Sequence, residues 1–326
     1  MEISVESDLS KEKRDMKKLL LLVLGIFIFP TLAFGWSLHG EMTKIVLDTL
    51  PWLNKYRDIE ITPYSYNDSS VYNSNYKTPY LEGKFGERTD AKTILSIYAD
   101  EPDWGMDEGL FLNSMQSLTG GSHGWRHQYY MLLGGLIKVG EAPERVVHFY
   151  NMAIEAFKKN DSYWGNRFLA RSLHYLQDLT NPFHSNPGPL PILLSNIWDI
   201  NGLTVLVTNH HYALEDYQEY QIKKRNQLYF RALRNSSPIK INNLWESAVN
   251  LANKSKDYSE LLWNLQGRIF GEKISQKSPF KINLEKVLSG ELKNDYDKII
   301  ISALIDFAGI TKGFLEYAKV IFKSSN

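Results

Sequence analysis

Residues 171–184, RSLHYLQDLTNPFH, constrain the fold more than any other part of this sequence. His174 and Asp178 are four residues apart, so on a helix both side chains lie on one face, one turn apart. We expect Asn181-Pro182 to end that helix, because the residue before a proline is pushed out of the α region. His184 follows after a short turn, so two imidazoles and one carboxylate are delivered together. These are ligand types that Zn²⁺ takes.

A second pair with the same spacing lies further along the chain, at His211 and Glu215. One such pair means little, but the two pairs together favour a metal site. The chain has no cysteine, so a metal must sit among histidines and carboxylates.

The charge balance argues against two kinds of charged surface or segment. The 326 residues include 37 basic and 37 acidic side chains. A neutral chain argues against a broad basic face for nucleic acid and against an acidic disordered tail.

The N-terminus resembles a secretory signal. Lys17-Lys18 precede an apolar run at 19–29, and small residues follow at Ala33 and Gly35. The alternative is a membrane anchor, but the run is shorter than the about 20 residues that a span needs and is followed by Pro30. We therefore predict a signal peptide at 1–35 and a secreted or periplasmic protein. Cleavage would make Trp36 the first mature residue, with an α-amine and a carbonyl that can chelate a metal.

Hydrophobic periodicity predicts helices through most of the mature chain. The segments expected to be helical are 39–50, a short helix around 94–98, 142–159, 161–180, a long helix running from His211 toward Arg234, 242–271, 282–291 and 294–322. Residues 53–90 are predicted to form a long surface excursion, and 120–124 a loop after which His127 opens a helical stretch. No strand alternation or repeat is recognisable. The prediction is one all-α, multi-helix domain over residues 36–326, large enough for a substantial core.

Residues 187–208 are unusually apolar and lie between the two metal-like pairs. Two interpretations stay open. The segment forms buried packing, or it forms an apolar lip over a lipid or substrate.

The eight histidines bear on function through their combination, because a single histidine is more often a core or surface residue than a ligand. The combination is the spacing His174-x3-Asp178-x5-His184, the pair His211-x3-Glu215, His39 shortly after the expected N-terminus, and a carboxylate and histidine near 103 and 127. In this respect the chain resembles the superfamily of zinc-dependent phospholipases C and S1/P1 nucleases. The resemblance spans residues 36–215; residues 216–326 match only as further helices.

The resemblance implies an all-α domain of the phospholipase C/P1 nuclease type with three zinc ions. Carried over position by position, the ligands of the three ions would be Asp103 (or Asp100), His127, His174 and Asp178; then His184, His211 and Glu215; then the α-amine and carbonyl of Trp36 with His39 and the shared Asp178.

For two of the candidate metal ligands, a nearby residue of the same type is an alternative. Asp103 is preferred because an aromatic residue, Trp104, follows it, whereas Asp100 matches the Trp-Ala-Asp of the nuclease branch through Tyr98-Ala99-Asp100. His127 is preferred to His123, which lies among glycines.

Only one of two adjacent histidines has the right spacing to Glu215. His211 is therefore preferred to His210. His123 and His210 are interpreted as supporting or loop residues, and His148 as an ordinary helix residue.

The resemblance implies hydrolysis of a phosphoric ester, with the early aspartate (Asp103 or Asp100) as the catalytic general base. Trp104 and the apolar segment 187–208 favour a phospholipase C-like enzyme acting on phospholipid, with contact to a membrane surface. One alternative is a single-strand nuclease/3′-nucleotidase, for which the many tyrosines could stack on bases. Another is a secreted, zinc-stabilised binding protein without turnover. No obligate protein partner is implied.

Overall fold

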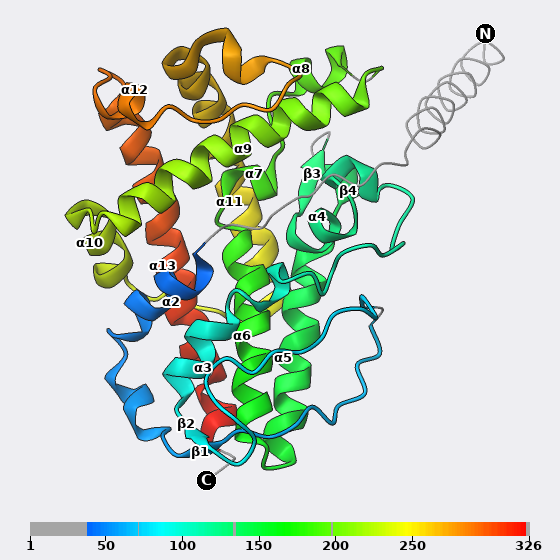
Figure 1. Ribbon diagram of the computed structural model, residues 1–326, viewed down its shortest axis with the longest axis vertical. Coiled ribbons are helices and arrows are strands. Elements are labelled where there is room, and N and C mark those ends of the chain that lie inside the picture. Colours follow the sequence, from blue (N-terminus) through cyan, green and yellow to red (C-terminus); the bar gives the residue numbers. More distant parts are fainter. Residues whose placement is uncertain (1–37, 71, 133–134, 197, 324–326) are drawn as a thin grey trace, which may run out of the picture.

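Helix α6 (Ser162–Asp178) runs through the middle of the molecule, and every side chain from Tyr163 to Asp178 is buried (Figure 1). It begins where the Asp161 carboxylate accepts a hydrogen bond from the backbone N–H of Trp164, at 3.1 Å. Soon after its end, Asn181 caps the next short helix by accepting a hydrogen bond from Phe183 N, at 3.0 Å. The prediction that the helix ends before Pro182 is confirmed, but His184 lies in a second short helix, α7 (Pro182–Ser185), and not after a turn that follows the proline.

The computed structural model describes residues 38–70, 72–132, 135–196 and 198–323. Helices dominate this part of the chain, which confirms the all-α prediction. They are α2 (His39–Leu47), α3 (Ala91–Tyr98), α4 (Ser122–His127), α5 (Ala142–Lys158), α6, α7 (Pro182–Ser185), α8 (Leu190–Ser195), α9 (Ile200–Lys223), α10 (Gln227–Asn235), α11 (Leu244–Phe270), α12 (Leu284–Leu288) and α13 (Lys293–Lys323). Short 3₁₀ helices lie at Pro51–Lys55, Glu101–Asp103, Gln116–Thr119 and Gly271–Ser275.

Two small antiparallel pairs of strands were not predicted. Strand β1 (Ile59–Glu60) pairs with β2 (Arg88–Thr89), and β3 (Tyr130–Leu132) pairs with β4 (Ile137–Val139). Strands of two or three residues are too short to carry a recognisable alternation of apolar and polar side chains. The first pair joins the two ends of the predicted surface excursion at 53–90.

The prediction that His127 opens a helix is wrong, because His127 is the last residue of α4. Gly120 and Gly121 have positive φ angles of 81° and 112°, so the chain enters the helix at Ser122. A Cβ on Gly124 would lie 1.7 Å from the carbonyl oxygen of Thr119. These glycines therefore allow a tight helical turn where a loop was expected.

Two large apolar clusters form most of the core, and a third, small one gathers Trp125, Tyr130 and Val139. One gathers α3, α5 and α6 with the start of α11 and the end of α13, around Phe149, Phe168 and Phe314. The other gathers α2, α9 and α10 with the end of α11 and the start of α13, around Tyr217 and Phe307. The long helices α11 and α13 contribute to both, so they join the two clusters.

The long helix expected from His211 toward Arg234 is two helices. Helix α9 already begins at Ile200 and ends at Lys223, and α10 follows after a corner at Arg225. Figure 1 shows α9 crossing above α6. His211 and Glu215 of α9 both contact the side-chain amide of Asn181, three residues after the end of α6, at 3.2 and 3.1 Å.

The apolar segment 187–208 divides in two. Leu206 of α9 is buried, as the packing interpretation expects. Helix α8 has no buried residue, and Leu190, Leu194 and Trp198 are 42%, 55% and 77% exposed. Buried packing is therefore the wrong interpretation for α8. No helix within the described residues is long and apolar enough to span a bilayer.

Candidate metal centre

Three groups of metal-binding side chains meet where α2, α4, α6, α7 and α9 come together. Within each group, one ligand atom per residue lies within 4.8 Å of the others. The groups are Asp103, His123 and His127; His39, His174 and Asp178; and His184, His211 and Glu215. Every predicted ligand histidine and carboxylate among the described residues is therefore in this assembly. Trp36 lies outside the described residues.

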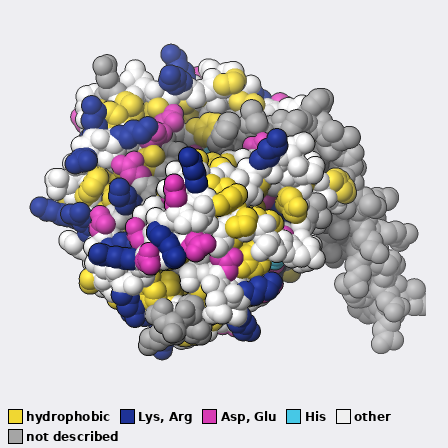
Figure 2. All heavy atoms as spheres, turned by 60° about the horizontal axis from the view of Figure 1, so that its bottom comes forward, with side chains coloured by type: hydrophobic (Ala, Val, Ile, Leu, Met, Phe, Trp, Pro, Cys, Tyr) yellow, Lys and Arg dark blue, Asp and Glu magenta, His cyan; other side chains and the backbone are white. Residues whose placement is uncertain are grey.

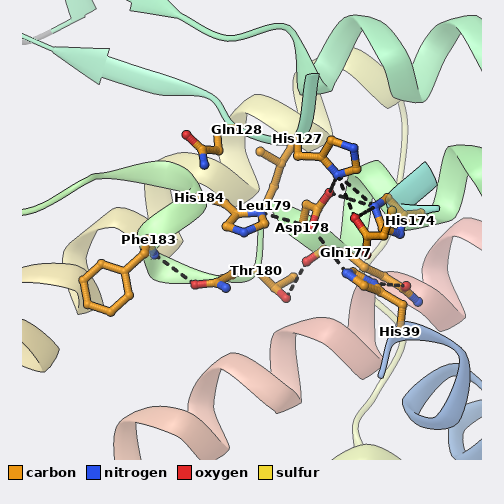
Figure 3. Close-up of polar contacts among 12 residues, drawn as sticks. His39, His127, Gln128, His174, Gln177, Asp178, Leu179, Thr180, Phe183 and His184 are labelled. Carbon is orange, nitrogen blue, oxygen red and sulfur yellow. Dashed lines mark hydrogen bonds and ion pairs between the residues drawn. The ribbon is translucent and has the colours of Figure 1, made fainter. Parts of the chain in front are cut away.

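Asp178, at the end of α6, lies between four histidines (Figure 3). Its Oδ1 is 3.3 Å from His39 Nε2 and 3.1 Å from His184 Nδ1. Its Oδ2 is 2.9 Å from His127 Nδ1 and 3.2 Å from His174 Nε2. One buried carboxylate thus links all three groups.

The third group is built by α7 and α9. His211 and Glu215 lie one turn apart on α9, with His211 Nε2 2.8 Å from Glu215 Oε1. His184 Nε2 lies 3.0 Å from His211 Nε2. Asn181, which caps α7, also donates from its side-chain amide to Glu215 Oε1 at 3.1 Å. The cap that starts α7 therefore also aligns this carboxylate.

The two candidate aspartates occupy different environments. Asp103 Oδ1 lies 3.5 Å from His127 Nδ1, 3.5 Å from His174 Nε2 and 3.6 Å from His123 Nε2. Asp100 instead accepts a hydrogen bond from the backbone N–H of Gly40, at 2.8 Å. A Cβ on Gly40 would lie 2.4 Å from Asp100 Oδ2. Asp103 therefore belongs to the assembly, whereas Asp100 holds α2 in place through its hydrogen bond with Gly40.

His123, which the sequence analysis set aside, is part of the assembly. Its ring stacks on that of His127, with centroids 3.9 Å apart, and it is buried. A signal for it existed, because His123 and His127 are four residues apart. The surrounding glycines suggested a loop and hid that spacing.

Outward hydrogen bonds hold the rings in place. His174 Nδ1 lies 2.6 Å from the carbonyl oxygen of Ala99, and His39 Nδ1 lies 2.9 Å from Gln177 Oε1. Gln177 in turn donates to the hydroxyls of Thr43 and Thr311. A ring nitrogen occupied in this way leaves the other nitrogen to face the cluster.

Asp107 is a fully buried carboxylate that the sequence gave no reason to select. It lies 3.3 Å from His127 Nε2, and it accepts hydrogen bonds of 2.5 Å from both Arg126 Nη1 and Tyr175 Oη. Burial alone would raise the pKa of Asp107, but His127 and the guanidinium groups of Arg145 and Arg126 hold it well below its usual value. Asp107 is therefore an anion that fixes the outer face of the His127 ring.

The pKa values of the histidines and carboxylates in the assembly are shifted in different directions. For Asp178, burial would raise the pKa, but the charges of the surrounding histidines outweigh burial and hold it well below the usual range. For His174, burial would lower the pKa, but Asp178 and Asp103 raise it well above the usual value. Burial raises the pKa of Glu215 to about 7, against the attraction of His211. Burial lowers the pKa of His184 to about 4.

The contacts within the assembly are compatible with a divalent cation in each group. His174 Nε2 lies 3.0 Å from His127 Nδ1, and His184 Nε2 lies 3.0 Å from His211 Nε2. Facing ring nitrogens at this distance cannot both carry a proton without repulsion. Asp178 Oδ1 and His184 Nδ1 are buried without a hydrogen bond of good geometry. Imidazole and carboxylate donors without thiolates suit Zn²⁺ or a similar ion.

The two remaining histidines lie elsewhere. His210 is buried, stacks on Trp263 with centroids 3.6 Å apart, and lies 2.7 Å from Gln266 Oε1 through its Nδ1. His148 on α5 pairs with Asp68 at 3.0 Å. Neither belongs to the three groups.

Comparison with known proteins finds only distant structural likenesses. No family model matches the sequence, and neither does any curated protein. Among solved structures, the alpha toxin of Clostridium absonum matches with a TM-score of 0.38 and 14% identity, over 72% of this chain and 55% of its own. The alpha-toxin of Clostridium perfringens matches with a TM-score of 0.37 and 10% identity, over 90% of this chain and 63% of its own. The chain thus spans less than two thirds of either toxin, and the side chains described above carry the inference of function.

Proposed function

We propose that this protein is a secreted zinc-dependent hydrolase of phosphoric esters, and that it acts as a phospholipase C on phospholipid. The observation that carries the proposal is the sharing of Asp178 by three groups of histidines and carboxylates. Neighbouring cations held by a common carboxylate suit a phosphodiester, whose negative oxygens need compensation on both the attacking and the leaving side.

When bound, zinc would neutralise phosphoryl oxygens and lower the pKa of a coordinated water. The protein would contribute orientation and proton transfer. His39 and His174 are held by Gln177 and by the Ala99 carbonyl, so their inner nitrogens are positioned before substrate arrives.

Asp103 is our candidate for the general base. Its side chain is 16% exposed, whereas those of Asp178 and His174 are fully buried. Burial would raise the pKa of Asp103, but the charges of His174 and His127 outweigh it and lower the pKa to about 2. An ionised carboxylate at the open side of the assembly can accept a proton from an attacking water.

The exposed apolar side chains on α8 and just after it favour phospholipid over nucleic acid. Leu190, Leu194 and Trp198 follow closely after His184 and precede His211, so they lie on a segment that connects two candidate ligands. Exposed apolar and Trp side chains suit the interface of a lipid aggregate. A chain that is neutral overall argues against a broad basic face for a nucleic acid.

Two parallel assays with zinc present test the substrate class. One measures release of diacylglycerol from phosphatidylcholine, and the other measures release of mononucleotides from single-stranded DNA. Diacylglycerol release supports the proposal, whereas mononucleotide release alone supports the nuclease alternative. If neither product forms while zinc is bound, the protein is a zinc-stabilised binding protein.

Secretion is a separate part of the proposal. It rests on the charged and apolar N-terminal sequence at 1–35. N-terminal sequencing of the exported protein should read Trp36-Ser37-Leu38. A mature protein that keeps residues 1–35 would contradict both secretion by cleavage and a ligand role for the α-amine of Trp36.

Zinc affinity should fall as the pH falls below 7. Glu215 has a pKa of about 7, and the pKa values of His127 and His174 are raised above the usual value for histidine. Below those values each group holds a proton that zinc must displace, so the affinity should drop about tenfold per pH unit for each proton released. Calorimetry in buffers of different ionisation enthalpy measures the number of protons released when zinc binds. Binding without proton release at pH 6 would contradict the ligand role of these groups.

Asp107→Asn should weaken zinc binding about 10- to 100-fold, the usual cost of losing the outer partner of a ligating histidine. The variant keeps the size of the side chain but removes the charge that faces His127 Nε2. Competition with a chromophoric chelator measures the affinity, and Asp48→Asn, at an exposed aspartate, is the matched control. If the variant loses stability but binds zinc normally, Asp107 supports only the fold.

A further inference from the structure

Helix α10 carries a cavity that the metal centre does not use. Its volume is about 400 Å³, and its walls combine guanidinium groups, side-chain amides and one aromatic ring. The lining residues are Arg225, Gln227, Phe230, Arg231, Arg234 and Asn235. None of them is acidic, and none belongs to the three metal-binding groups.

The three arginines form no ion pair with any residue that the structure describes. Among the described residues, the arginines that form ion pairs are Arg88, Arg126, Arg145, Arg167 and Arg171. The arginines of the cavity form none. Three like charges around one small volume repel each other, so an anion bound there gains from all three.

The sequence around the cavity is basic in a chain that is neutral overall. No acidic residue occurs between Lys223 and Glu246. The basic residues in that interval are Lys224, Arg225, Arg231, Arg234 and Lys240. On the face drawn in Figure 2, Lys and Arg side chains are interspersed with Asp and Glu side chains.

The backbone at the rim of the cavity is held in an unfavourable conformation. Arg225 has a φ of 54°, in the left-handed region, where Gly or Asn would be less strained. This corner ends α9 and turns the chain into α10. Asn226 fixes it by accepting a hydrogen bond from Leu228 N at 3.0 Å and donating to Gln221 Oε1 at 2.8 Å. A cationic side chain kept at such a position suggests a role for the cation.

The helix that carries the cavity is firmly anchored. Tyr229 is buried and donates to Asp297 Oδ1 at 2.7 Å, and Leu233 is fully buried. At the other end, Lys312 donates to the carbonyl oxygens of Arg234 and Ser236, at 2.6 and 2.9 Å. Arg231 and Arg234 therefore extend from a fixed backbone, which lowers the cost of ordering them around a ligand.

We propose that this cavity is a binding site for a phosphate-bearing anion. Guanidinium groups bind phosphate oxygens in pairs of parallel hydrogen bonds, and three of them more than compensate the negative charge of one phosphate group. Gln227 and Asn235 add amide donors, and the half-buried ring of Phe230 offers an apolar surface to the organic part of the ligand. The phosphate can come from a soluble phosphate ester or from the head group of an anionic phospholipid. The site stands independently of the proposed hydrolysis.

Chemical protection of individual arginines tests the site without measuring activity. The full-length mature protein is treated with phenylglyoxal at constant ionic strength, and modification of each arginine is followed by peptide mass spectrometry. The additions are inorganic phosphate, vesicles of phosphatidylglycerol, and vesicles of phosphatidylcholine. Arg57 and Arg268 are internal controls, because they are exposed and do not line the cavity. At a ligand concentration about ten times the dissociation constant, modification of the three arginines should slow about tenfold.

Each outcome decides the proposal. Protection by inorganic phosphate supports a site for soluble phosphate esters, and protection by phosphatidylglycerol vesicles alone supports a lipid head group. Modification at the same rate in all samples overturns the proposal. So does protection that includes Arg57 and Arg268, or that phosphatidylcholine vesicles give equally well.

A pair of variants gives a second measurement. Arg231→Gln combined with Arg234→Gln should abolish the protection of Arg225, whereas Arg268→Gln should leave it unchanged. Both changes are at exposed positions, so the protein should fold normally. Undiminished protection of Arg225 in the double variant would show that the three arginines do not act as one site.

Discussion

Replacing Asp178 by Asn should lower zinc affinity by more than the about 100-fold that marks the upper cost of losing an outer partner. Asn has nearly the same shape, but it carries no negative charge and offers only one oxygen. Asp178 lies within 3.3 Å of a nitrogen of four histidines, so the loss affects all three groups at once. Hydrolysis of the phosphoric ester should fall by at least the same factor.

The control for this variant is Asp257→Asn, at an exposed aspartate on α11. Zinc content, zinc affinity and hydrolysis are measured on both proteins. If Asp178→Asn retains the full zinc content and rate, the carboxylate is not the shared ligand, and the proposed centre is wrong in its main feature.

Glu101→Gln should lower the free energy of unfolding by about 3–5 kcal/mol, the usual cost of removing one partner of a buried ion pair. Glu101 accepts hydrogen bonds from Arg167 Nε at 2.9 Å, from Arg171 Nε and Nη2 at 2.8 Å, and from the Tyr76 hydroxyl at 2.8 Å. Burial would raise the pKa of Glu101, but the two guanidinium groups outweigh burial and lower it to about 2. The variant leaves both arginines buried without their anion.

Urea unfolding measures this loss, with Glu260→Gln at an exposed position as the control. Because the folded pKa of Glu101 lies below its ordinary value of 4.5, its contribution should be lost as the pH falls from about 4.5 to about 2. A change of less than about 1 kcal/mol at neutral pH would mean that the two arginines find other partners. Glu101 also lies between Asp100 and Asp103, so the same variant should disturb the position of Asp103.

Short sequence patterns predicted those parts of the site whose residues lie on one helix or on neighbouring turns of the chain. The pairs His174/Asp178 and His211/Glu215 are fixed by the turn of a single helix, and His184 follows from the proline that starts α7. The helices α5, α6, α11 and α13 were predicted nearly to their ends, because each has a long apolar stripe.

The parts that failed depend on distant contacts or on glycine conformations. Asp107 acquires its role only by meeting His127, Arg126 and Tyr175 in space. His123 was set aside because its glycine neighbours suggested a loop, whereas they form the start of α4. The end of α9 was missed because the break occurs at Arg225, a residue that rarely adopts a positive φ.

The most direct test is the zinc content and zinc position in the purified mature protein. After zinc loading and dialysis, we expect one ion for each of the three groups, seen by elemental analysis and by anomalous diffraction at the zinc edge. The anomalous peaks should lie around Asp178. They should also lie next to the side chains of His39, His127, His184 and Glu215. A protein that holds less than about one zinc per chain, or whose peaks lie away from Asp178, would contradict a shared metal centre.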